Sequence, residues 1–181
     1  LFRSHAYQMA DEQWLAKMEA LGYPLYVKPA NLGSSIGISR VENRDALKDA
    51  IDLAFAYDRK VVVEKGVADA MEINCSVLGI ADDCRASLCE KPLGWKDFLT
   101  FEDKYLRGGK GKNAATRQIP APIEETMTDR IQTLAKQIFT EMDCKGVVRI
   151  DFLVDNQTGE LYVNEINTIP GSMAFYIWEP C

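Results

Sequence analysis

Two apolar runs near the end of the chain, GVVRIDFLV (residues 146–154) and LYVNEIN (161–167), carry the polar side chains on which the fold assignment depends. The segment DNQTG (155–159) between them is rich in turn-forming residues, so the two runs predict the strands of a β-hairpin. Side chains alternate between the two faces of a strand. Arg149 and Asp151 therefore share one face of the first strand, and Glu165 and Asn167 share one face of the second.

If Asp151 pairs opposite Glu165, two carboxylates meet on the sheet, which is destabilising unless a cation lies between them. Oxygen ligands select a hard ion such as Mg²⁺, which proteins hold through one or two carboxylates while nucleotide phosphates fill other positions. Asn167 would complete this shell, and Arg149 would offset charge on a transferred phosphoryl group. The alternative is an exposed hairpin face with solvated charges, and the alternation of side chains leaves both interpretations open.

Outward from this hairpin, hydrophobic spacing and turn residues predict a mixture of helices and strands. The expected helices cover residues 11–21, a segment that begins at Asn43 or Arg44, and residues 123–142. The expected strands cover residues 25–29, 38–41, 61–65, 72–79 and 85–90. Residues 91–122 form a polar stretch with little periodicity, and loops of that length are uncommon unless they are functional or mobile.

Two further segments have the composition of binding elements, although each is weak alone. The loop Gly33-Ser34-Ser35-Ile36-Gly37 offers backbone N–H groups and hydroxyls to a phosphate, but it is neither a Walker A sequence nor GxGxxG. Taken alone, the loop favours a plain hairpin turn over a phosphate site. Glu64 and Lys65 end a valine-rich strand, where a carboxylate, a cation and a free backbone edge can read an adenine. A solvated strand end is the alternative.

The composition excludes several classes of function. The net charge of -6 over 181 residues argues against a sequence-independent grip on nucleic acid. The single histidine, His5, leaves no basis for a His-based zinc site or a Ser-His-Asp triad. Five cysteines without a CxxC pair predict reduced thiols, and neither an apolar run of membrane length nor a signal peptide is present, so we expect a cytoplasmic protein.

Taken together, the motifs resemble the ordered series of the D-alanine–D-alanine ligase family, a branch of the ATP-grasp superfamily. The segments that carry the resemblance are YVKP (26–29), GSSIGIS (33–39), VEK (63–65), FEDKY (101–105), RIDF (149–152) and NEINTIPG (164–171). Six motifs in the family's order, over residues 22–181, form a specific signal. The closing segment GSMAFYIW (171–178) departs from the family's longer loop and is more similar to the vancomycin-resistance ligases that make D-alanyl-D-serine.

The resemblance implies an α+β ATP-grasp fold, with a small α/β lid subdomain and a larger, mostly antiparallel sheet with flanking helices. It assigns residues 1–67 to part of the lid subdomain and residues 68–181 to a truncated C-terminal subdomain. Nothing before Leu1 corresponds to the family's N-terminal substrate domain, and both ends have the character of cut edges. The expectation is therefore that this piece alone does not ligate.

The resemblance also implies roles for individual residues. Metal ligands match Asp151, Glu165 and Asn167, with two magnesium ions expected and Mn²⁺ as a substitute. ATP-binding positions match Lys28, Ser35, Glu64, Lys65, Val67, Glu72, Phe98 and Lys104. Catalytic positions match Ser34 in the loop over the γ-phosphate, Arg149 beside the acyl phosphate, Tyr105 in a mobile loop and Ser172 at the second substrate's carboxylate. Plain packing or exposed-charge explanations remain open for Tyr105, Phe98 and Glu72.

The implied activity is ATP-dependent carboxylate–amine ligation, in which D-alanine is joined to a second D-amino acid, D-alanine or D-serine, for peptidoglycan synthesis. D-alanine would be activated as an acyl phosphate, and the amine of the second substrate would attack it, with no covalent enzyme nucleophile. The implied partners are these small molecules, and intact ligases of this kind are homodimers. The rival interpretations are another ATP-grasp carboxylate–amine ligase and a non-catalytic nucleotide-binding module.

Overall fold

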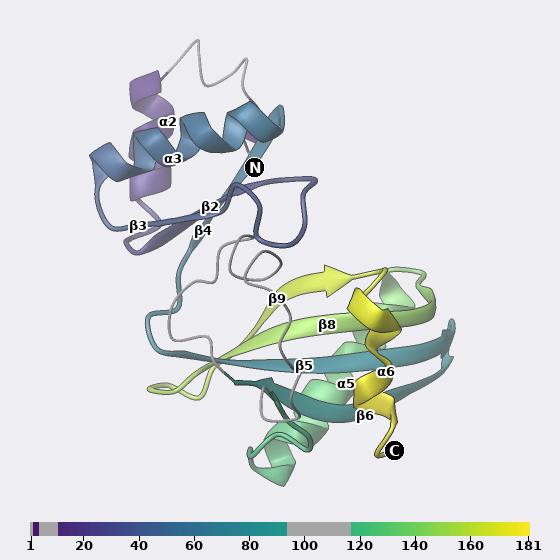
Figure 1. Ribbon diagram of the computed structural model, residues 1–181. Coiled ribbons are helices and arrows are strands. Elements are labelled where there is room, and N and C mark those ends of the chain that lie inside the picture. The colour runs from purple at the N-terminus through teal and green to yellow at the C-terminus, as the bar shows by residue number, and fades with distance from the viewer. Residues whose placement is uncertain (1, 4–10, 94–116) are drawn as a thin grey trace, which may run out of the picture. The chain divides into compact units, whose positions relative to one another are not determined.

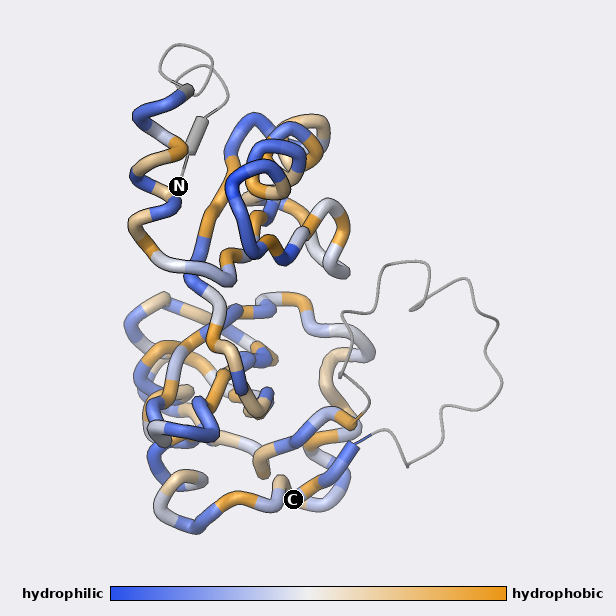
Figure 2. The backbone as a smooth tube through the Cα atoms, turned by 90° about the vertical axis from the view of Figure 1, so that its left-hand side faces the viewer, coloured by the Kyte–Doolittle hydropathy of each residue, from blue (hydrophilic) through white to orange (hydrophobic). Residues whose placement is uncertain are grey.

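A computed structural model of the chain describes residues 2–3, 11–93 and 117–181. The described residues divide into two compact units, the first ending at Ala68 and the second beginning at Asp69 (Figure 1). Each unit has its own hydrophobic core. Polar and apolar residues alternate along the chain in both units, as expected for elements that bury one face (Figure 2).

The first unit is a four-stranded sheet in the order β1-β4-β2-β3. Its strands are β1 (Phe2–Arg3), β2 (Leu25–Pro29), β3 (Ser39–Val41) and β4 (Lys60–Lys65), and its helices are α2 (Asp11–Glu19) and α3 (Arg44–Tyr57). Strand β2 is antiparallel to both β3 and β4. Strands β3 and β4 are therefore parallel to each other, with α3 between them in sequence and β2 between them in space.

Helix α3 shows how the sequence fixes this unit. The side chain of Asn43 accepts a hydrogen bond from the backbone N of Ala46 at 3.0 Å, which satisfies a donor that the first helical turn leaves free. Leu47, Ile51 and Ala54 follow at helical spacing and are fully buried in the core against the sheet. The predicted start at Asn43 or Arg44 is thus confirmed, whereas α2 ends at Glu19, two residues before the predicted helix end.

The second unit is a five-stranded antiparallel sheet in the order β7-β6-β5-β8-β9. Its strands are β5 (Ala70–Ile80), β6 (Asp83–Pro92), β7 (Arg117–Gln118), β8 (Lys145–Asp155) and β9 (Leu161–Asn167). Its helices are α5 (Glu125–Glu141), the 3₁₀ turn η2 (Gly171–Ala174) and α6 (Phe175–Trp178).

The two faces of this sheet differ in chemistry. One face is apolar and packs on α5, where Ile131, Ala135 and Phe139 meet strand residues such as Ile150 and Phe152. The other face carries polar side chains, and α6 lies on that side of the sheet, away from α5 (Figure 1). Trp178 Nε1 of α6 donates to Ser76 Oγ at 3.0 Å. The sheet therefore has a hydrophobic side that holds the fold together and a polar side available for chemistry.

The predicted small α/β part and the predicted larger antiparallel sheet with flanking helices are both present. The sequence analysis did not predict that β6 continues to Pro92 or that Arg117–Gln118 pairs with it as β7. It also left helix α6 undefined inside an apolar run. None of the helices in the described residues has the length and apolar character needed to span a membrane.

Candidate functional site

The predicted hairpin forms in the register that the side-chain pattern required. Strands β8 and β9 are antiparallel, with Asp151 opposite Glu165 and Arg149 opposite Asn167. The register shifts by a bulge between Asp151 and Phe152, directly beside the carboxylate pair. Bulges of this kind are frequent next to active sites because they re-aim a side chain. The pairing of Asp151 with Glu165, which alternation alone left open, is thereby confirmed.

Asp151 is the centre of a dense set of hydrogen bonds. Its side chain accepts from Arg149 twice, Nε to Oδ1 and Nη2 to Oδ2, each at 2.7 Å. Asn167 Nδ2 donates to Oδ2 at 2.9 Å. Only 4% of Asp151 is exposed, so this charge depends on its partners rather than on water.

The Arg149 guanidinium is held in its charged form by the same contacts. Burial acts to lower the pKa of Arg149, but hydrogen bonding and the charge of Asp151, aided by Tyr176, outweigh it and raise the pKa above its ordinary value. A fork-shaped, permanently charged guanidinium is suited to phosphate as well as to carboxylate. Arg149 therefore stands beside Asp151 as a fixed cation.

The donor set around Asp151 fits a hard divalent ion. Glu165 is exposed directly opposite Asp151, and Asn167 adds a carboxamide, so the available ligands are oxygens only. Among the described residues no group of three or more histidine, cysteine or carboxylate side chains is arranged to hold a metal. Two carboxylates and one carboxamide suit Mg²⁺, whose remaining positions are commonly filled by water and phosphate.

The polar row continues from β8 across the neighbouring strands. Asn74 on β5 lies opposite both Asp151 and Glu90 in the register, and its Nδ2 donates to Glu90 Oε2 at 3.3 Å. Glu90 is 3% exposed. Glu72, two residues before Asn74, has a pKa raised from 4.5 to about 7 by burial and then by the Asp151 charge. One face of the sheet thus concentrates carboxylates close to the Arg149 guanidinium.

The structure adds residues that the sequence analysis missed. Arg117 on β7 lies with its Nε 3.6 Å from Glu90 Oε1 and with its guanidinium 3.7 Å from the centroid of the Tyr176 ring. Tyr176 in turn accepts a hydrogen bond from Arg149 Nη1 at 3.5 Å. Glu90 ends the strand predicted over residues 85–90, so its place on a strand could be found from the sequence. Arg117 and Tyr176 had no such signal, because only the tertiary fold brings them to this face.

The ATP-binding positions expected in the first unit lie on β2, β4 and the loops beside them. Lys28 forms an ion pair with Glu64, and the two side chains are 23% and 41% exposed. Lys65 at the end of β4 is exposed, and Val67 beyond it is half-buried. Strand β1 pairs with β4 only at Lys60 and Val61, so that pairing does not reach the Glu64 end of the strand.

The serine-rich loop between β2 and β3 has a special backbone. Ser34 and Ser35 have φ angles of 56° and 60°, in the left-handed region that L-residues seldom adopt, and Ser34 is exposed. Gly37 has φ 69°, and a Cβ added there would lie 2.8 Å from the Tyr57 ring. The loop is therefore a shaped element that requires its glycine, and the predicted hairpin around it is confirmed.

The remaining predicted positions are less informative. Phe98, Lys104 and Tyr105 lie outside the described residues. Ser172 is exposed in η2 and has a left-handed φ of 53°. All five cysteines are free thiols.

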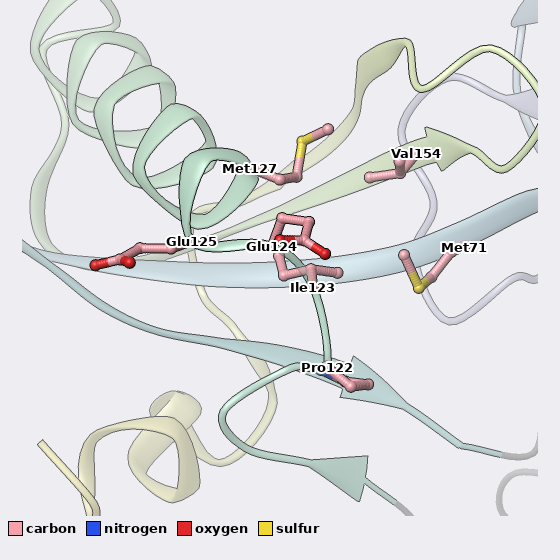
Figure 3. Close-up of a pocket in the computed structure, with 7 residues that line it drawn as sticks. All are labelled: Met71, Pro122, Ile123, Glu124, Glu125, Met127 and Val154. Atoms are coloured by element: carbon pink, nitrogen blue, oxygen red, sulfur yellow. The ribbon is translucent and has the colours of Figure 1, made fainter.

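A hollow of about 460 Å³ lies on the other side of the second unit (Figure 3). It is lined by Met71 and Val154, which are cross-strand partners, and by residues at the start of α5, including Met127. Met71 and Val154 belong to the apolar core face of the sheet. The hollow contains none of the predicted site residues and is separate from the Asp151 face.

Comparison with known families places these observations in context. The family profile described as "D-ala D-ala ligase C-terminus" matches residues 1–178. A D-alanine–D-alanine ligase of Thermoanaerobacter sp. is 44% identical over 167 residues, covering 90% of this chain and 45% of the relative. The corresponding protein of Thermosipho africanus is 42% identical over 161 residues, 89% of this chain and 42% of the relative. The chain thus spans about half the length of these curated relatives.

Solved structures give the same result. The VanG D-Ala:D-Ser ligase of Enterococcus faecalis superposes with a TM-score of 0.74 at 33% identity, over 94% of this chain and 46% of that one. The D-alanine–D-alanine ligase of Coxiella burnetii gives 0.68 at 28% identity, over 98% of this chain and 43% of that one. The predicted ATP-grasp fold is therefore confirmed. With the family profile covering nearly its whole length, the chain belongs to the D-alanine–D-alanine ligase family and corresponds to its C-terminal part.

Proposed function

We propose that this chain is the ATP- and magnesium-binding portion of a ligase that joins D-alanine to a second D-amino acid for peptidoglycan synthesis. Family membership supports this proposal, as do the relatives named D-alanine–D-alanine ligase. The names of those relatives support D-alanine as the second substrate, and the likeness to the VanG D-Ala:D-Ser ligase supports D-serine. The whole protein acts in the cytoplasm, where its nucleotide is available, and is a homodimer.

The observation that carries the proposal is the Asp151–Glu165 pair on adjacent strands with Asn167 on the same face. Two carboxylates directly opposite each other on a sheet repel, so a purely structural role gives no reason for this pair. They become favourable when a divalent cation lies between them, and bound magnesium neutralises phosphate charge and orients the phosphates. Asp151, Glu165 and Asn167 are therefore the proposed ligands, with two ions expected.

The other proposed roles follow from charge and position. Arg149 is fixed beside Asp151, so it can stabilise the negative charge on a phosphoryl group passing to the carboxylate of D-alanine. The amine of the second substrate then displaces the phosphate from this acyl phosphate. Glu72 binds the ribose hydroxyls. Because its pKa is raised to about 7, the carboxyl is partly protonated near neutral pH and can either donate or accept a hydrogen bond. Ser172 serves the carboxylate of the second substrate.

Residues 1–67, which lie in the first unit, are proposed to act as the lid subdomain, and residues 68–181 as the C-terminal subdomain. In the first unit, Glu64, Lys65 and Val67 read the adenine while Lys28, Ser34 and Ser35 serve the phosphates. The half-exposed Lys28–Glu64 pair keeps the lysine oriented while leaving it accessible. Phe98 and Lys104 complete the ATP contacts, and Tyr105 covers the second substrate.

The decisive experiment is a calorimetric titration of the chain with Mg-ATP and with ATP plus a chelator. Glu165→Gln is the most informative variant because Glu165 is exposed, so its loss should leave the fold intact. We expect this variant to weaken Mg-ATP binding by about tenfold or more, since a carboxylate ligand to a divalent ion is lost. Asp151→Asn should remove the magnesium dependence altogether.

The matched control is Asp129→Asn, which makes the same charge change at an exposed position of α5, the helix on the opposite face of the sheet. Its Mg-ATP affinity should equal that of the unaltered chain. A flat titration of the unaltered chain would contradict the proposal, as would equal losses in Glu165→Gln and Asp129→Asn.

A further inference from the structure

Tyr176 lies between two guanidinium groups of the polar face. The guanidinium of Arg117 is 3.7 Å from the centroid of its ring, and its hydroxyl accepts from Arg149 Nη1 at 3.5 Å. The ring and the hydroxyl thus have separate partners. Substitution of Tyr176 by phenylalanine removes the hydroxyl contact with Arg149 and retains the ring contact with Arg117.

The hydroxyl contact matters because Asp151 both holds the Arg149 guanidinium and is a proposed magnesium ligand. Both of its oxygens hold Arg149, and Oδ2 also accepts from Asn167. A carboxylate has about four lone-pair sites, and these bonds use three of them. An ion at Asp151 would take the remaining site and draw negative charge away from the oxygens that hold Arg149, which weakens the contacts that orient the guanidinium. The Arg149 guanidinium donates side-chain hydrogen bonds to two described residues, Asp151 and Tyr176, so the bond to Tyr176 is the one that does not involve Asp151.

Tyr176 is itself held firmly enough to act as a support. Its stacking partner Arg117 lies beside the buried carboxylate of Glu90. The next residue, Ile177, is fully buried, and Trp178 Nε1 donates to Ser76 Oγ at 3.0 Å. Helix α6 is therefore anchored to the sheet by the two residues that directly follow the tyrosine, and the hydroxyl has a defined place.

We propose that Tyr176 is a positioning residue: its hydroxyl keeps Arg149 aimed while Asp151 is shared with a magnesium ion. The inference rests on the proposed function in that the ion and the nucleotide belong to it. The contact itself exists in the chain alone. It can therefore be tested with no ligand present.

The first test is nuclear magnetic resonance of the arginine side chains in ¹⁵N-labelled full chain. Rotation about the Arg149 Cζ–Nη1 bond should be slow compared with that of the exposed Arg130. Tyr176→Phe should speed the Nη1 rotation severalfold while Nη2, held by Asp151, changes little. The control is Tyr162→Phe, which removes a hydroxyl bonded to Glu160 at the hairpin turn and should leave Arg149 unchanged.

The second test compares nucleotides by calorimetry. Tyr176→Phe should weaken Mg-ATP binding about threefold to tenfold, the effect of losing one hydrogen bond of ordinary strength, since the bond to Arg149 is long at 3.5 Å. AMP binding should be unchanged, because AMP lacks the phosphates that Arg149 serves. A merely structural role for Tyr176 would weaken both nucleotides alike and lower the melting temperature.

The outcomes separate this inference from the proposed function. If the unaltered chain binds no Mg-ATP, the proposed function fails, and the Nη1 rotation still decides the role of Tyr176. Fast Nη1 rotation in the unaltered chain overturns the positioning role, as does a Tyr176→Phe variant with unaltered rotation. So does a Tyr176→Phe variant that unfolds, since the hydroxyl is then structural.

Discussion

The two units hold their proposed ATP-site residues in different ways. In the first unit, Lys28 and Glu64 form a single ion pair that water reaches on both sides. In the second, Asp151 is almost fully buried and makes three hydrogen bonds to two partners. Exposed pairs contribute little to stability, whereas removing one member of a buried pair leaves an uncompensated charge. In the second unit, a proposed ligand residue therefore also contributes strongly to the free energy of unfolding, whereas in the first unit the proposed ATP-site pair contributes little.

The strongest way to break this contrast is Asp151→Asn. The substitution leaves the Arg149 guanidinium without its carboxylate, so we expect the free energy of unfolding of the second unit to fall by about 3 kcal/mol. Urea unfolding combined with amide hydrogen exchange measures this, because exchange reports β8 and β4 separately. Unchanged protection of β8 would contradict the account.

Glu72→Gln tests the same unit through pH. The folded-state pKa of Glu72, about 7, lies above its ordinary value of 4.5, so ionising this carboxyl costs stability. The stability of the metal-free chain should decline as pH rises from about 4.5 to about 7 and stay level above. Glutamine should flatten that decline and stabilise the chain at pH 8 by about 2–3 kcal/mol. Parallel stability–pH curves for the two proteins would refute the assignment.

In the first unit, Gly37→Ala should act through the local backbone. The positive φ and the approach of a Cβ to Tyr57 should destabilise this unit by about 1–2 kcal/mol. Gly33→Ala is the matched control, because a Cβ there meets nothing within 4 Å. Thermal melts of the two variants give the comparison. Equal melting temperatures would contradict the left-handed backbone at Gly37 and its close approach to Tyr57.

Lys28→Gln should have the smallest effect on stability and so sharpens the contrast. Loss of a half-exposed ion pair should change the free energy of unfolding by less than about 1 kcal/mol. The affinity for Mg-ATP should nevertheless fall, because the proposed phosphate contact is removed. A large loss of stability together with unchanged nucleotide affinity would reverse both expectations. Denaturant unfolding and calorimetry on the same preparation decide this.

Much of the second unit could be predicted because its signals are local. Alternation along 146–154 and 161–167 indicated which side chains share a face, and the observed register brings Asp151 and Glu165 together as expected. The boundaries of α6 and β7 could not be found in this way. Helix α6 is only four residues long and β7 only two, so neither shows a period, and both depend on packing against the sheet.

The sequence by itself determined the family, the order of most of the elements and which polar side chains share a face of each strand, because strand alternation and motif order are properties of the linear chain. The register that pairs Asp151 with Glu165 was a hypothesis at that stage, and the structure decided it. Only the tertiary structure decided that Arg149 forks onto Asp151 and that Glu90, Arg117 and Tyr176 join this face. These contacts connect β6, β7, β8 and α6, which lie far apart in sequence. Their formation depends on the order of strands in the sheet and on which side chains are buried, and neither can be predicted from a local sequence pattern.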